Sequence, residues 1–125
     1  MSKFAHSDFL DGGLLAIKNG AIRMLLLKAY ATGDSYATVV GNAVATVNMT
    51  SADFTIATSG SNRVLTTAAK SVSATAASDV GDAHIAFTNG VDKVMWVTDE
   101  TGEAPLSSGD TVNFPALSYT SNQPT

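Results

Sequence analysis

The chain has 125 residues, no cysteine, a formal net charge of −4 and only 14% charged residues, below the roughly 25% of an average soluble domain. This length predicts one domain with one core, and the lack of cysteine excludes a disulfide scaffold and thiol chemistry. Its Lys and Arg residues form no basic run, which argues against nucleic-acid binding. No apolar stretch approaches the roughly 20 residues of a membrane span, and residues 1–8 lack the apolar core of a signal peptide. We therefore expect synthesis in a reducing cytoplasm.

The first predicted element is a helix that begins at Ser7 or Asp8, as its cap, and ends near residue 19. Leu10, Leu14 and Ile17 follow the helical spacing of four and three, so they share one face. Residues 1–7 before the helix are predicted to be an arm that orders only against a partner.

The rest of the chain is predicted to consist of strands, because small or apolar residues alternate with polar ones between turn signals such as Asn89-Gly90. The predicted strands are Ala21–Ala29, Tyr36–Val40 (brief), Ala43–Met49, Phe54–Ala57, Arg63–Lys70, Ser71–Ala76, Ala83–Thr88, Lys93–Thr98 and Thr111–Thr120. Residues 66–78 read as a hairpin of two of these strands.

About eight short strands in one domain indicate an all-β fold, and we expect a two-sheet sandwich of jelly-roll type with a short N-terminal helix. A plain immunoglobulin-like sandwich is the second possibility. The domain is expected to cover residues 8–120, with Trp96 and Phe114 as core anchors and residues 121–125 as a flexible tail. Pro115 predicts an edge position, because proline cannot donate to a ladder.

Few residues could carry chemistry. Asp79, Asp82 and His84 are the best metal candidates, but they lack the second cluster of a closed site. The acidic segment 99–103 is expected in a hairpin loop and lacks the alternating ligands of a calcium loop. With His6 and His84 as the only histidines and no nucleophile-elbow motif, the sequence predicts neither an enzyme nor a cofactor.

Three segments resemble small virion proteins of tailed bacteriophages. Residues 9–25 are similar to a short helix that leads into the first strand of those proteins. Asp53–Ile56, Arg63–Lys70 and Ala83–Phe87 are similar to their central strands, and residues 106–116 to a turn that enters a last strand broken by proline. The resemblance implies a virion component, and more narrowly a capsid decoration or cement protein on the outer shell.

The function implied by this resemblance is to clamp neighbouring major capsid subunits, with the chain as a symmetric homo-oligomer, a trimer being favoured. Lys3, Phe4 and His6 in the arm are the expected partner contacts, with Phe4 as an apolar anchor. A surface with little charge suits this role, because covering it costs little desolvation. No nucleic acid or membrane is expected as a partner.

Two alternatives remain open. The first is a tail, neck or head-fibre component of the same sandwich type. The second is a carbohydrate- or receptor-binding sandwich, in which Tyr30, Tyr36 and Tyr119 would line one shallow site.

Overall fold

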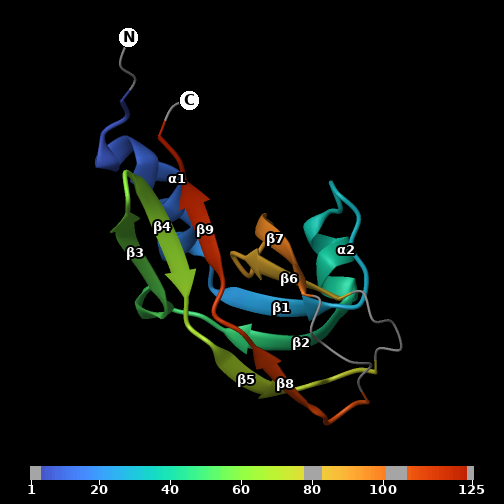
Figure 1. The fold of residues 1–125 in the computed structure, drawn as a ribbon. Coiled ribbons are helices and arrows are strands. Elements are labelled where there is room, and N and C mark those ends of the chain that lie inside the picture. The colour runs from blue at the N-terminus through green and yellow to red at the C-terminus, as the bar shows by residue number, and fades with distance from the viewer. Residues whose placement is uncertain (1–3, 78–82, 101–106, 124–125) are drawn as a thin grey trace.

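A computed structural model describes residues 4–77, 83–100 and 107–123, apart from the side chains of residues 99 and 100 (Figure 1). The helical elements are α1 (Ser7–Gly20), α2 (Tyr36–Gly41) and the 3-10 turn η1 (Ser51–Asp53). The strands are β1 (Arg23–Leu27), β2 (Ala43–Asn48), β3 (Phe54–Ser59), β4 (Asn62–Thr67), β5 (Lys70–Ser73), β6 (Ala83–Thr88), β7 (Val94–Glu100), β8 (Thr111–Phe114) and β9 (Ser118–Ser121).

Within the described residues, the strands form three antiparallel sheets. Four strands are arranged in the order β2-β1-β6-β7, three in the order β3-β4-β9, and β5 pairs with β8. Figure 1 shows α1 against the three-stranded sheet and α2 at the far end of the four-stranded sheet. The predicted all-β class with a short N-terminal helix is therefore confirmed.

The two smaller sheets are parts of one long ladder. β4 pairs with β9 and β5 pairs with β8 in the same register, from Arg63↔Ser121 to Ser73↔Thr111. The ladder is interrupted around Pro115, where the Thr67 N–H still donates to the Leu117 carbonyl at 2.8 Å. Pro115 thus lies between β8 and β9, each an outermost strand of its sheet, which agrees with the predicted edge position, and a residue without an N–H interrupts the regular pairing there.

Two predicted segments are divided differently in the structure. Arg63–Lys70 contains all of β4 except Asn62, and the first residue of β5. The predicted hairpin within residues 66–78 is wrong, because β5 pairs with β8. Tyr36–Val40 is helical in α2 instead of a strand, because the Ser35 hydroxyl caps the Thr38 N–H and Val39 is fully buried.

α1 forms as predicted, with Leu10, Leu14 and Ile17 buried on one face. Its N-cap is His6, and neither Ser7 nor Asp8, since the Asp8 N–H donates to His6 Nδ1 at 3.1 Å. The helix ends before Ala21, whose N–H donates to the Ile17 carbonyl.

The main core lies where α1 and the three sheets meet. Its largest fully buried side chains include Phe54, Phe87 and Phe114, which confirms Phe114 as a core anchor. Trp96 is half-buried and packs against the margin of this core. A second cluster, formed by Leu25, Leu27, Val39 and Ala86, fills the space between the other face of the four-stranded sheet and α2.

Candidate interaction groove

An apolar groove of about 390 Å³ opens between α1, β7 and β9. It is lined by Phe9, Leu10, Gly13, Leu14, Ile17, Met95, Trp96, Tyr119 and Ser121. None of these residues carries a formal charge, and the side chains of Tyr119 and Ser121 supply hydroxyls, with the Trp96 ring N–H as the other polar group. We call this hollow the α1–β9 groove. Its composition favours an apolar occupant.

A run of aromatic rings leads from the core to this groove. Phe87 packs edge-on against Phe54 and is stacked with Trp96 at 4.9 Å between centroids, with 14° between the ring planes. Trp96 in turn meets Tyr119 edge-on at 5.5 Å. Phe87 is fully buried, whereas Tyr119 is 47% exposed, so the groove wall is anchored in the core and ends at the surface.

Polar contacts fix α1 as one wall of the groove. Arg63 in β4 donates from Nε and Nη2 to both carboxylate oxygens of Asp11, at 2.8 and 3.1 Å, and this pairing raises the pKa of Arg63. At the other end of the helix, Lys18 Nζ donates to the carbonyls of Ser51 and Phe54, each at 2.7 Å. Both ends of α1 are therefore tied to the strands beneath it.

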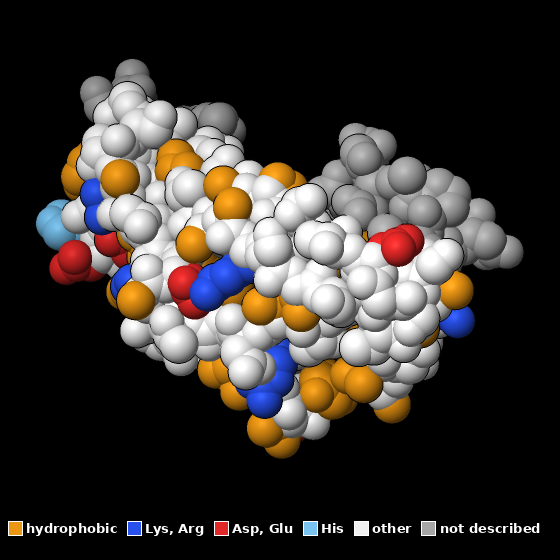
Figure 2. All heavy atoms as spheres, turned by 90° about the horizontal axis from the view of Figure 1, so that it is seen from below, with side chains coloured by type: hydrophobic (Ala, Val, Ile, Leu, Met, Phe, Trp, Pro, Cys, Tyr) orange, Lys and Arg blue, Asp and Glu red, His pale blue; other side chains and the backbone are white. Residues whose placement is uncertain are grey.

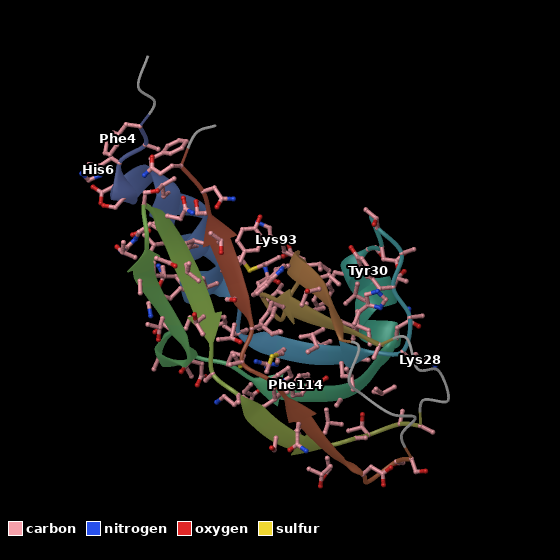
Figure 3. All side chains as sticks on the ribbon, viewed as in Figure 1. Phe4, His6, Lys28, Tyr30, Lys93 and Phe114 are labelled. Carbon is pink, nitrogen blue, oxygen red and sulfur yellow. The ribbon has the colours of Figure 1, made fainter. Side chains whose placement is uncertain are left out.

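The predicted contact residues of the arm fall in different situations. Lys3 lies outside the described residues, and Phe4 is 76% exposed. His6 caps α1. Ala5, which lies between Phe4 and His6, is buried. Its N–H donates to Gln123 Oε1 at 2.8 Å, and its carbonyl accepts from Gln123 Nε2 at 2.9 Å. Figure 3 shows Phe4 at the N-terminal end of α1. Among the described residues of the arm, Phe4 and His6 are therefore exposed, while Ala5 is fixed to the domain.

The three tyrosines predicted to share one site do not lie together. Tyr119 lines the α1–β9 groove, whereas Tyr30 lines a different hollow of about 370 Å³ with Thr32, His84, Val97 and Thr98. Tyr36 belongs to α2 and lines neither. The expectation of a single tyrosine-lined site is wrong, because Tyr119 lies in β9 whereas Tyr30 follows β1 and lines a different hollow.

Only one of the three metal candidates lies in the part of the chain that the structure describes. Asp79 and Asp82 lie outside the described residues, and His84 in β6 packs its ring 5.7 Å from that of Tyr30. Residues 99 and 100 belong to β7 and not to the expected hairpin loop, because β7 continues its pairing with β6 as far as Glu100. Across the described ranges, no group of three or more His, Asp or Glu side chains could hold a metal ion.

Figure 2 shows one face of the molecule, on which most of the surface is neither hydrophobic nor charged and acidic and basic side chains are few. Elsewhere large apolar side chains reach solvent: Phe4 and Phe9 at the start of α1 are 76% and 77% exposed, and Val91 is 73% exposed. Phe9 also lines the groove, whereas Phe4 does not.

Comparison with protein-family models, with curated proteins and with solved structures found no match. Among the residues that the structure describes, no helix is both long enough and apolar enough to cross a membrane. The features of the molecule that bear on function are therefore the groove, the arm and the surface.

The sequence did not predict the α1–β9 groove. Its walls come from residues 9–17, 95–96 and 119–121, which only the tertiary fold brings together. One local signal existed: Phe9 stands off the buried face of α1 beside the paired glycines at 12 and 13. An aromatic residue that a helix leaves exposed is a candidate contact residue.

Proposed function

We propose that this chain is a structural component of a tailed-bacteriophage virion, and specifically a decoration protein that clamps neighbouring major capsid subunits on the outer shell. The observation that carries the proposal is the apolar surface of the α1–β9 groove, which includes the exposed Phe9, together with the exposed Phe4 at the N-terminal end of α1 (Figure 3). Exposed apolar surface of this kind marks a protein contact more often than a catalytic site. The resemblance of residues 9–25 and 106–116 to phage virion proteins supplies the setting.

The low surface charge supports the same proposal. Only 14% of the residues are charged, so most of the surface can be covered by a neighbour without desolvating ions. Attachment would then depend on apolar burial and backbone hydrogen bonds, which salt does not screen.

The proposed arrangement of the sheets is a two-sheet sandwich of jelly-roll type. The four-stranded sheet is one layer, and the ladder formed by β4–β5 with β8–β9, together with β3, is the other. Buried side chains from both layers share one apolar cluster, which supports this arrangement. A rigid sandwich is a suitable frame for a clamp, because its contact surfaces keep their spacing.

The test is the number of copies per particle, measured by quantitative mass spectrometry of purified virions against the major capsid protein. A copy number in the hundreds supports the decoration role, whereas about six or twelve copies would assign the chain to the tail, neck or a head fibre. Absence from the particle would refute the proposal.

A second measurement tests the mode of attachment. Binding to bare shells should persist from low salt to about 1 M, where the Debye length falls to about 3 Å. Decorated shells should also resist heat better than bare ones, because a ligand of the assembled state stabilises it by mass action. Release at moderate salt would contradict the apolar contact.

The hollow beside Tyr30 favours glycan binding as a second function. A half-buried tyrosine ring, two threonine hydroxyls from Thr32 and Thr98, and the His84 ring line this hollow, which is more polar than the α1–β9 groove. Aromatic faces flanked by hydroxyl groups are suited to sugars. Binding of the isolated protein to a glycan array, lost in Tyr30→Ala, would establish this function, and a blank array would remove it.

A further inference from the structure

The α1–β9 groove is large enough for aromatic side chains. An apolar cavity of about 150 Å³ accommodates a benzene ring, so a groove of about 390 Å³ can take about two such groups. Gly13 lines the groove, and a Cβ at this position would meet nothing within 4 Å. The wall formed by α1 therefore leaves room for an incoming side chain.

The groove also lies beside two strand edges. β7 is the last strand of its sheet and β9 the last strand of the other, and within the described ranges nothing pairs with their outer edges. Unpaired strand edges offer backbone N–H and carbonyl groups to an extended chain. An occupant that combines an extended backbone with an apolar side chain would satisfy both features of the site.

The chain itself carries such a segment. Phe4 is the aromatic residue of the arm, 76% exposed and absent from the lining of its own groove. The backbone at His6 is extended, with φ −67° and ψ 151°, and the bonds from Ala5 to Gln123 fix the point from which the arm leaves the domain.

Charge complements this fit. Lys3, next to Phe4, is the only charged side chain of residues 1–6, whereas the whole chain has a net charge of −4. Asp8 precedes Phe9 in α1 and does not line the groove; its side chain is 93% exposed, with Oδ2 3.7 Å from His6 Nδ1. An arm that places Phe4 beside Phe9 would bring a lysine toward this carboxylate.

We propose that the α1–β9 groove receives the N-terminal arm of a second copy of this chain, with Phe4 as the side chain that fills it. The inference deepens the proposed function, and rests on it for its setting in a virion, by naming the partner that the groove binds. Each copy then gives an arm and accepts one, a head-to-tail contact that forms a ring such as a trimer where the rotation between copies closes.

The first experiment fills the groove from its own wall. Gly13→Leu should occupy the hollow and also improve α1, because leucine is a far better helix former than glycine. Gly12→Leu is the matched control, since Gly12 has the same open space but does not line the groove. In sedimentation velocity over a range of concentrations, we expect wild type and Gly12→Leu to associate alike. Gly13→Leu and Phe4→Ser should each weaken association by at least about tenfold.

The second experiment identifies which copy supplies the arm. The chain has no cysteine, so Ser2→Cys in the arm of one tagged chain and Gly12→Cys beside the groove of another, which keep Phe4 and the groove lining intact, can be joined by a short bismaleimide reagent without background. A cross-link between the two tags is the expected result. A chain carrying both substitutions that cross-links only within itself would overturn the proposal.

Other results would overturn it as well. A wild-type chain that stays monomeric at every concentration has no second copy in the groove, which would then belong to another partner. Association that survives Gly13→Leu would place the contact elsewhere. Sedimentation and cross-linking test the arm contact, whereas the copy number in virions tests the decoration role. Either proposal can therefore be refuted while the other stands.

Discussion

Replacing Trp96 by alanine tests whether the groove wall also holds the fold together. Trp96 is half-buried, stacked on the fully buried Phe87 and in edge contact with Tyr119. The substitution removes both ring contacts. It also widens a groove that is already open to water, so it leaves no sealed cavity.

The expected loss of stability follows from this geometry. A tryptophan buries about 150–250 Å² when fully enclosed, so half burial removes about 100 Å² from water, worth about 2.5 kcal/mol at 25 cal/mol/Å². The stacked pair adds about 0.5–1 kcal/mol. We therefore expect Trp96→Ala to cost about 3 kcal/mol, at the lower end of the range for buried tryptophans, which lowers Tm by about 10–15 °C.

The assay is urea unfolding followed by far-UV circular dichroism, because Trp96 is the only tryptophan and its fluorescence disappears with it. Trp96→Phe is the matched control, since it keeps a ring on Phe87 and should cost about 1 kcal/mol. A loss below about 1 kcal/mol for Trp96→Ala, with association abolished, would show that the residue serves only an interface.

Three further predictions concern single positions. Gly90→Ala should destabilise the protein by about 2–3 kcal/mol in thermal melts, because φ is +74° and a Cβ would lie 2.9 Å from Ile22 Cδ1. Gly60→Ala is the control, because Gly60 has φ of +63° but open space around it, and it should cost only about 1 kcal/mol. Equal losses of stability for the two variants would contradict a clash between the Cβ added at Gly90 and Ile22. The Thr50 N–H, and then Lys70, hold the pKa of Asp53 below its ordinary value of 3.8, so this carboxylate stabilises the fold above that value and the gain is lost as pH falls through the lower folded pKa. Asp53→Asn should therefore make the urea midpoint less dependent on pH below about 4, and an unchanged pH profile would refute the linkage. Finally, His6→Asn should raise stability by about 0.5–1 kcal/mol in the same melts, because asparagine is a preferred N-cap, and a loss would mean that the His6 ring does more than cap α1.

Much of the fold could be predicted from the sequence where local pattern and burial agree. The buried face of α1 follows from the spacing of Leu10, Leu14 and Ile17, and it is confirmed. The strand predicted within Ala21–Ala29 appears as β1, in the centre of its sheet and buried over Met24–Leu27. In these segments the periodicity reports directly on which side of the element faces the core.

Prediction failed where two local signals compete. The residues of α2 include β-branched Thr38, Val39 and Val40, which favour a strand, but Ser35 offers a cap and burial of Val39 decides for a helix. The groove could not be predicted for a different reason. Its walls depend on which strands end up at the sheet edges, and that is set by pairings between residues far apart in the chain.

The single register of the β4–β5 and β8–β9 ladder has a consequence for synthesis. The partners of β4 and β5 are residues 111–121, so half of this ladder is the last described part of the chain to leave the ribosome. At about 5–20 residues per second, the 21 or so residues after β7 take about one to four seconds to appear. During that interval the four-stranded sheet has all its strands, while β4 has one edge unpaired and β5 has no strand partner. Nascent chains on neighbouring ribosomes of one messenger could therefore pair through this unpaired edge. A lower rate of translation initiation, which spaces the ribosomes further apart, should favour correctly folded protein.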